Sequence, residues 1–342
     1  MPTMKLSVFR RLCLIGTLLA LCVVVLGAWV RLSDAGLGCP DWPGCYGHLT
    51  VGQALDNVER ANQAYPHRPL EAGKAFKEML HRYLAASLGL LILVIAAFAW
   101  ANRRDPAQPS RLPLLLVMLV VFQGLLGMWT VTLLLKPLFV VAHLIGGLTT
   151  MALLWWLALP TPAAGAGSGL RRTVLLALAI LALQIALGGW VSSNYAALAC
   201  PDFPTCQASL WPEMDFRDAF VLWRGLGIDY EGGVLDHPAR VAIHYTHRIG
   251  ALLAALVLGL AVWRAMRAGS RRERIAAAAL GAVLVIQLML GPAMVLARLP
   301  LPLATAHNAV AALLLLATVA LLRSVPAPAT RVRAALESRA PS

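Results

Sequence analysis

Eight continuous apolar runs limit what this chain can fold into more than any other feature of its sequence. The runs cover about 11–30, 80–101, 113–135, 138–158, 173–192, 240–263, 274–297 and 302–323, and each is bounded by charge, proline or glycine. About 20 helical residues cross the roughly 30 Å hydrocarbon core of a bilayer. The runs lack the alternating pattern of a transmembrane barrel strand. The sequence therefore predicts an all-α integral membrane protein with eight transmembrane helices.

The composition and the first run agree with this fold class. Only 13% of the residues are charged and 59% are hydrophobic, whereas soluble domains carry about 25% charged residues. The first run leads into Trp29, Val30 and Arg31 rather than into a small-residue cleavage site. We therefore expect a retained helix instead of a signal peptide. With no transit peptide visible, we expect a bacterial cytoplasmic membrane rather than a mitochondrial one.

The net charge of +13 is distributed unevenly between the two sides that eight spans create. With the N-terminus inside, the inner segments hold 17 of the 29 basic residues but only three of the 16 acidic residues. This asymmetry follows the positive-inside rule, so we expect a multi-pass protein with both termini in the cytoplasm. The basic excess is then a topology signal, and we expect the lipid bilayer, and no nucleic acid, as its partner.

Two long outer segments, about 31–79 and 193–239, hold four of the six cysteines. These are Cys39, Cys45, Cys200 and Cys206, in the matching sequences Cys-Pro-Asp-Trp-Pro-Gly-Cys and Cys-Pro-Asp-Phe-Pro-Thr-Cys. Outside the cytoplasm such cysteines form disulfides, either within each loop or between the two loops. Closing so short a loop stabilises a fold by roughly 2 kcal/mol in the chain-entropy model. Zinc is disfavoured by the spacing and by the lack of supporting histidines.

The chain contains an internal repeat. Trp29 precedes Cys39 by ten residues and Trp190 precedes Cys200 by ten, Gln123 precedes His143 by twenty and Gln287 precedes His307 by twenty, and His81-Arg82 matches His247-Arg248. We therefore predict two copies of a four-helix unit. Because four is an even number, the copies share one orientation and form two parallel-repeat bundles with pseudo-twofold symmetry. We place the N-terminal bundle at 1–160 and the C-terminal bundle at 161–342, with the boundary in the Pro/Gly/Ala stretch 160–169.

Four histidines occupy matching places in the two copies, near the outer ends of the even-numbered helices: His81, His143, His247 and His307. An ionisable side chain inside a membrane is costly and is a functional candidate by default. Each copy supplies one histidine from its second helix and one from its fourth, at similar depth. This arrangement is typical of bis-histidine haem ligation in a helix bundle. A non-haem metal site and purely structural histidines are the alternatives.

The neighbours of these histidines refine the hypothesis. Arg82 and Arg248 directly follow two of them and are candidates to pair with haem propionates, with snorkelling to the interface as the alternative. Glu78 lies three residues before its histidine, whereas His244 takes that place in the second copy. A carboxylate beside one site only indicates chemistry in the first copy, unless Glu78 is an ordinary surface residue at a helix start. The repeated glutamines are expected to make structural interhelical hydrogen bonds.

The motifs together resemble one family. They are Gly27-Ala-Trp-Val-Arg-Leu-Ser33, Gly36-Leu-Gly-Cys-Pro-Asp-Trp-Pro43, Glu78-Met-Leu-His-Arg82, the segment from Gln123 to His143, and the second copy. In combination, from about residue 9 to 323, they are similar to heme A synthase. Any one of them alone would be a weak signal.

The resemblance implies an eight-helix enzyme that oxidises the C8 methyl group of haem O to a formyl group, through a hydroxymethyl intermediate, and so makes haem A for terminal oxidases. By position, His81 and His143 would bind the substrate haem, Glu78 would be the catalytic acidic residue, and His247 and His307 would bind the iron of a haem b cofactor. The cysteine pairs match those members that carry cysteines in both outer loops.

Two other classes of function compete with this one. A di-haem membrane electron carrier or haem transporter would also need four intramembrane histidines, but it gives no reason for Glu78. A thiol oxidoreductase would explain the cysteines but not the histidines, and Cys-x5-Cys is not the usual redox spacing. We expect haem O as substrate and haem O synthase, the protoheme farnesyltransferase, as a partner. The electron acceptor and a homo-oligomeric state stay open.

Overall fold

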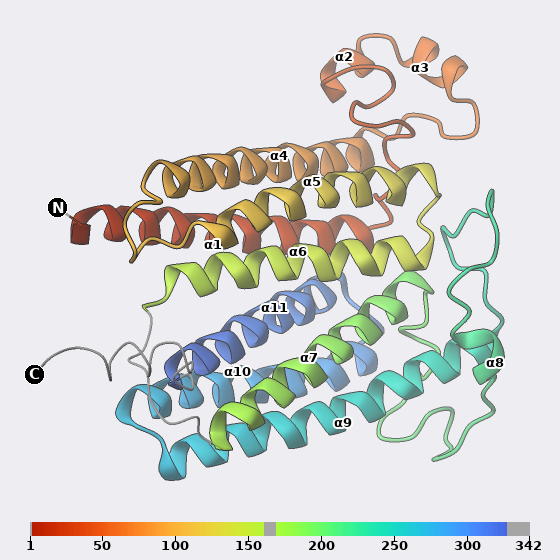
Figure 1. The fold of residues 1–342 in the computed structure, drawn as a ribbon. Helices are drawn as coiled ribbons and strands as arrows, with labels where there is room; N and C mark the ends of the chain where they lie inside the picture. Colours follow the sequence, from red (N-terminus) through yellow and green to blue (C-terminus); the bar gives the residue numbers. More distant parts are fainter. Residues whose placement is uncertain (1, 161–168, 327–342) are drawn as a thin grey trace, which may run out of the picture.

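The computed structural model describes residues 2–160 and 169–326, and within them the chain is helical (Figure 1). Eight helices are long and apolar enough to cross a membrane, which confirms the predicted number of spans. They are α1 (Pro2–Leu32), α4 (Ala72–Ala101), α5 (Arg111–Thr132), α6 (Pro137–Ala158), α7 (Gly169–Ser193), α9 (His237–Ala268), α10 (Arg271–Leu296) and α11 (Leu301–Ser324). The short helices α2 (Val51–Leu55), α3 (Val58–Ala64) and α8 (Phe216–Ala219) lie between them in the long loops.

Local sequence signals explain where several helices begin. A proline stands in the first turn of α6, α9 and α11, where its missing N–H needs no partner and its fixed backbone angle suits a helix. Ser270 and Glu273 form a capping box at the start of α10. Helix α4 begins at Ala72, well before the apolar run that starts near residue 80. Glu78 therefore lies in the second turn of a helix and is buried, with 4% of its surface exposed.

The transmembrane helices form two groups. Helices α1, α4, α5 and α6 contact one another in a ring, in the order α1–α4–α5–α6, and α7, α9, α10 and α11 do so in the order α7–α9–α10–α11. Between the groups, α1 packs against α11, and α6 packs against both α7 and α11. The helices of the two groups follow one another around their rings in the same sequence, as a four-helix repeat predicts. The predicted domain division stays a prediction. Its boundary stretch includes residues 161–168, which lie outside the described residues.

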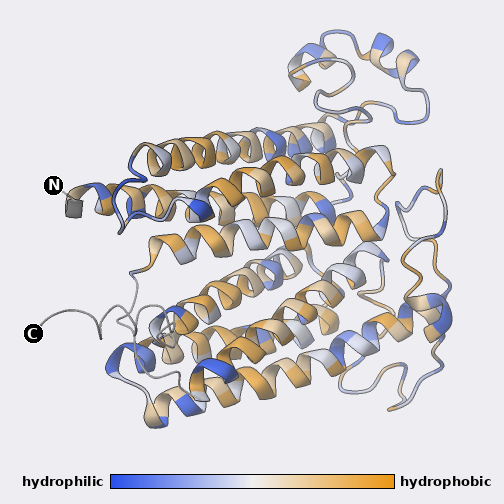
Figure 2. Cartoon of the chain, in the orientation of Figure 1, coloured by the Kyte–Doolittle hydropathy of each residue, from blue (hydrophilic) through white to orange (hydrophobic). Residues whose placement is uncertain are grey.

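The hydropathy of the surface agrees with a membrane position. Apolar residues cover the helices along most of their length, and polar residues gather at the helix ends and in the long loops (Figure 2). Both long loops, residues 33–71 and 194–236, lie at the same end of the helices, which we call the loop end (Figure 1). All four repeated histidines belong to helices that start there. The candidate site is therefore positioned by the loop-end turns of α4, α6, α9 and α11.

Candidate functional site

The structure brings the histidines of each group together in pairs. In the first group the imidazole rings of His81 on α4 and His143 on α6 lie edge to face, with centroids 6.5 Å apart and ring planes at 82°. In the second group His247 on α9 and His307 on α11 occupy the matching places, and each ring contacts the side-chain amide of a glutamine, Gln184 at 3.0 Å and Gln287 at 3.3 Å. Each pair joins the two helices that the sequence predicted. The arrangement therefore supplies two imidazole pairs, one in each helix group.

A glycine on a neighbouring helix makes room for one ring of each pair. A Cβ atom at Gly27 of α1 would lie 2.8 Å from Cε1 of His81, and one at Gly188 of α7 would lie 3.2 Å from Cε1 of His247. A Cβ atom at Gly127 or Gly291 would lie 3.5 or 3.7 Å from Cε1 of His143 or His307, which is ordinary van der Waals contact. Carbon atoms closer than about 3.4 Å repel, so a side chain at Gly27 or Gly188 would move the ring it faces.

The ring nitrogens fit a metal-bound porphyrin. Nδ1 of His81, His143 and His307 is buried and has no hydrogen-bond partner among the described residues. A buried polar atom without a partner costs free energy, which a ligand at the site would recover. Bonds from metals to histidine nitrogens are about 2 Å long, so the 6.5 Å between the first two rings accommodates one ion between them. The apolar helix faces around each pair suit a porphyrin plane.

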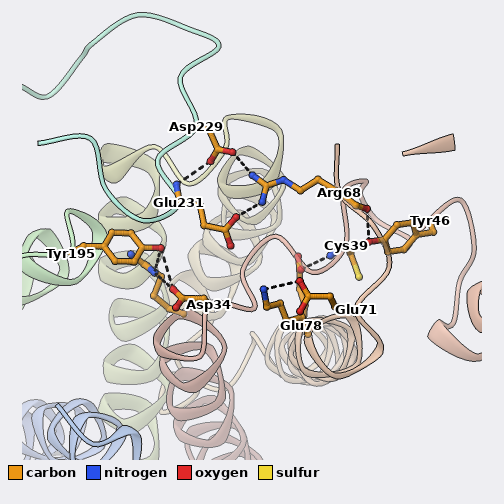
Figure 3. A network of polar contacts seen from close by, with 11 residues as sticks. Asp34, Cys39, Tyr46, Arg68, Glu71, Glu78, Tyr195, Asp229 and Glu231 are labelled. Atoms are coloured by element: carbon orange, nitrogen blue, oxygen red, sulfur yellow. Dashed lines mark hydrogen bonds and ion pairs between the residues drawn. The ribbon is translucent and has the colours of Figure 1, made fainter. Parts of the chain in front are cut away.

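Glu78 is held from two sides beside the first pair. One carboxylate oxygen accepts a hydrogen bond from the guanidinium of Arg82 at 2.6 Å. The other accepts from the backbone N–H of Cys39 at 2.8 Å (Figure 3). Arg82 lies one turn further along α4, and Cys39 belongs to the first disulfide loop. Glu78 is therefore fixed and charge-paired within one helical turn of His81, and it is not a surface residue at a helix start.

His244 makes the equivalent contacts in the second group. Its Nδ1 lies 3.4 Å from the backbone nitrogen of Cys200 and 3.1 Å from the carbonyl oxygen of Ala196. Its Nε2 accepts a hydrogen bond from Nε of Arg248 at 3.2 Å. The two groups thus use one design, in which an α-helical side chain joins an arginine to the first cysteine of the loop. Only the first group places a carboxylate there.

Both arginines bind the disulfide loops. Arg82 donates to the carbonyl oxygens of residues 41, 43 and 44, and Arg248 donates to those of residues 200, 202 and 205 at 2.8 to 2.9 Å. In the structure these guanidiniums are therefore loop anchors. Contact with haem propionates stays a prediction, and it requires some of these loop contacts to give way.

The cysteines pair within each loop, as one of the two predicted alternatives. Cys39 is bonded to Cys45 and Cys200 to Cys206, and all four are buried. An aspartate closes each loop: Asp202 accepts hydrogen bonds from the backbone N–H groups of Gln207 and Ala208 at 2.6 and 2.9 Å, and Asp41 does the same for residues 46 and 47. The disulfides therefore belong to the scaffold that holds Glu78 and His244.

The second long loop also crosses to the first helix group. We call residues 221–235 the strap. Its Tyr230 donates a backbone hydrogen bond to Leu134 at 3.1 Å, and its Asp229 and Glu231 both pair with Arg68 of the first long loop (Figure 3). The buried Lys136 at the start of α6 donates to the carbonyl oxygen of Gly225. Beneath these contacts is a polar cavity of about 110 Å³, lined by Leu37, Gly38, His67, Arg68, Pro69, Glu71, Lys74 and Glu231.

Sequence reasoning missed two parts of this site. The strap could not be expected, because its ion pairs join residues 161 to 163 positions apart. Gln184 on α7 could have been found, because it is a polar residue in the middle of an apolar run. Its Nε2 lies 3.0 Å from Nδ1 of His247. Matching the copies hid this residue, since the corresponding position in the first copy is Val23.

Known proteins share this sequence over most of its length. Residues 10–319 match the family COX15-CtaA, described as cytochrome oxidase assembly protein. The chain belongs to this family. The heme A synthase of Shewanella oneidensis is 44% identical over 322 residues, which are 92% of this chain and 95% of the relative. Heme A synthases of Rhizorhabdus wittichii and Sphingopyxis alaskensis are each 30% identical, over 89% of this chain and over 90% and 88% of their own lengths.

Membership of the COX15-CtaA family confirms the resemblance drawn from the motifs. The relatives are enzymes of haem A synthesis, so they support an enzymatic function and do not favour the electron-carrier alternative. The match to the family covers all four repeated histidines, Glu78 and both cysteine pairs.

Proposed function

We propose that this chain converts haem O to haem A by oxidising the C8 methyl group to a formyl group through a hydroxymethyl intermediate. The observation that carries this proposal is the difference between two otherwise equivalent places: Glu78 beside the first histidine pair and His244 beside the second. An electron carrier needs two imidazole pairs but no such difference. A reaction at one pair, with an auxiliary group at the other, accounts for both features.

In this proposal the histidine pairs have different roles. His81 and His143 bind the iron of the substrate haem, and His247 and His307 bind a haem b cofactor. Haem b supplies one-electron redox chemistry when bound. The orphaned ring nitrogens and the glycines that face the rings support ligation at both pairs. The 6.5 Å between the ring centroids of His81 and His143 leaves room for one ion between them.

Glu78 is proposed as the catalytic residue. Oxidation of a methyl to an aldehyde removes electrons and protons in two steps, so the site needs a group that accepts a proton or stabilises positive charge near the reacting carbon. Arg82 and the N–H of Cys39 fix both carboxylate oxygens, which keeps the group in one orientation. The loop contacts also exclude bulk water from it, since Glu78 is 4% exposed.

The proposed setting is a bacterial cytoplasmic membrane with the loop end outside and both termini in the cytoplasm. The basic residues of the inner segments support this orientation, and disulfides at the loop end fit an oxidising compartment. The farnesyltransferase that makes haem O is the expected supplier of substrate. The farnesyl tail of haem O can lie against apolar helix faces in the lipid.

The test is mass analysis of haem extracted after expression beside a source of haem O. Wild-type protein should yield haem A or its hydroxylated precursor. Glu78→Gln should form product about 10²–10⁴-fold more slowly, as for loss of a proton acceptor, and should therefore accumulate haem O. His81→Ala and His143→Ala should abolish product but keep bound haem b. His247→Ala and His307→Ala should lose haem b. His48→Ala, in an exposed loop position, is the matched control.

Three outcomes would contradict the proposal. Wild-type product from Glu78→Gln would remove the carboxylate from the reaction. Equal loss of haem b from all four histidine variants would contradict the division of roles between the pairs. Haem b alone in well-folded wild-type protein, with haem O supplied, would favour an electron carrier.

A further inference from the structure

Each disulfide loop is followed by an exposed apolar residue at the same place. Leu49 lies ten residues after Cys39, and Leu210 lies ten residues after Cys200. Both leucines are 73% exposed, and Trp211, which follows the second of them, is 74% exposed. No other large apolar side chain among the described residues is more exposed. Large apolar side chains that stay uncovered at matching places in two copies indicate an interaction surface.

A tyrosine of the neighbouring transmembrane helix holds each of these places. The hydroxyl of Tyr83 on α4 donates to the carbonyl oxygen of Leu49 at 2.6 Å. The hydroxyl of Tyr245 on α9 donates to the carbonyl oxygen of Leu210 at 2.9 Å, and its ring packs edge to face against Trp211 with centroids 5.7 Å apart. The two loop segments are therefore fixed against the sides of α4 and α9.

Both tyrosines belong to the lipid-facing surface of their helices. Residues three, four or seven apart lie on one face of a helix. A stripe of accessible apolar and aromatic residues with this spacing runs along each helix: Phe76, Tyr83, Leu90 and Val94 on α4, and Tyr245, Ile249, Leu252 and Leu256 on α9. Because both helices span the membrane, these stripes face lipid. The exposed loop residues continue the two stripes at the loop end.

The arrangement of the loops favours lipid over a protein partner. The first long loop, with α2 and α3, extends sideways past α4, and part of the second long loop extends sideways past α9 (Figure 1). Helices α4 and α9 lie on opposite sides of the molecule and pack only within their own groups. One protein partner would have to reach both sides, whereas lipid surrounds the whole bundle. Tyrosine and tryptophan are also the residues enriched at the level of the headgroups.

We propose that both disulfide loops lie in the headgroup region at the loop end and that Leu49, Leu210 and Trp211 insert into the lipid as anchors. Apolar anchors of this kind enter about 5–10 Å into the boundary between headgroups and acyl chains. This inference is independent of the proposed function, because it uses only the membrane spans and the loop contacts. Each loop is then held from inside by its arginine and from outside by lipid. In the first loop, this support helps to keep the backbone N–H of residue 39 against Glu78.

The test measures the depth of tryptophan residues in full-length protein in nanodiscs of phosphatidylcholine. Subtracting the emission of Trp211→Phe from that of wild type gives the fluorescence of Trp211, and phenylalanine keeps an aromatic ring against Tyr245. Leu49→Trp reports on the first loop in the same way. Glu59→Trp is the matched control, because Glu59 is an exposed, charged residue of the same long loop. The quenchers are aqueous iodide and phospholipids brominated near the headgroup end or near the methyl end of an acyl chain.

The two loop reporters should behave oppositely to the control. Fluorescence from position 211 and from Leu49→Trp should be quenched by brominated lipid, more strongly when bromine lies near the headgroup end, and should resist iodide. Glu59→Trp should be quenched by iodide and not by brominated lipid. Quenching of either loop reporter by iodide but not by brominated lipid would place its loop in water and overturn the inference. Resistance of either one to both quenchers would also overturn it, because protein would then cover the residue.

Discussion

Removing the guanidinium of Arg248 should increase the fraction of molecules in which the second disulfide loop is open, by a factor that its hydrogen bonds determine. In Arg248→Met the side chain keeps its approximate length but loses its donors to the carbonyl oxygens of residues 200, 202 and 205. A hydrogen bond from a charged donor contributes about 1.5–3 kcal/mol. The carbonyl oxygens of the half-buried residues 202 and 205 regain water, whereas that of the buried Cys200 does not, so we take about 3 kcal/mol for all three bonds together.

This free energy sets the expected rate of disulfide reduction. Cys200 and Cys206 are buried, so a reductant reaches them only after the loop opens. At 1.4 kcal/mol per factor of ten, about 3 kcal/mol raises the open population roughly 100-fold. Reduction followed by maleimide labelling and mass analysis should therefore be about 100-fold faster in Arg248→Met, with the Cys39–Cys45 bond unchanged.

The first loop supplies the control. Arg82→Met should accelerate reduction of Cys39–Cys45 and leave Cys200–Cys206 as in wild type, because the loop contacts of each arginine are all with the loop of its own helix group. If neither variant changes the reduction rate of its own disulfide, the loops are not held by these arginines. The reasoning from bond number to opening free energy would then be refuted.

Three further predictions concern other parts of the site. Gly27→Ala should displace the ring of His81 and lower product yield, whereas Gly124→Ala, which meets no atom within 4 Å, should match wild type in a haem extraction assay. The hydroxyl of Thr205 and neighbouring backbone N–H groups lower the pKa of Asp202 to about 2, below its unfolded value of about 3.9. The stability that the ionised carboxylate gives the second disulfide loop is therefore present above about pH 4 and lost toward pH 2. Phosphine reduction of the second loop should accelerate over that range in wild type but show no such pH dependence in Asp202→Asn. Arg68→Ala should release the strap and speed proteolysis within residues 221–235, and unchanged cleavage would show that the ion pairs do not hold it.

Much of the fold could be predicted because it depends on local sequence. The spans follow from apolar length, and the histidine pairs follow from repeat spacing once helices are assumed to pack side by side. The start of α4 was missed by about eight residues, because its first turns are polar and project beyond the apolar run. That extension decides whether Glu78 is a surface residue at a helix start or a buried one.

Contacts that depend on side-chain fit were beyond sequence reasoning. The arginines were expected near propionates because of their position beside the histidines, but carbonyl oxygens of the disulfide loops come within 3 Å of Arg248 in the folded chain. Similarly, Gln184 looks like an isolated polar residue in the sequence, but in the fold its Nε2 lies 3.0 Å from Nδ1 of His247. A repeat predicts what two copies share, and the functional information here lies where the copies differ.

The strap also limits the order in which this protein can be completed. Arg68 precedes its partner Glu231 by 163 residues, and both loops must reach the same side of the membrane before they meet. During synthesis the first four spans are therefore made before the ion pairs between the two long loops can form. These pairs form only after the fifth span has brought the second loop to the loop end. A truncated chain that ends before residue 221 lacks the strap, so its Arg68 cannot form these ion pairs.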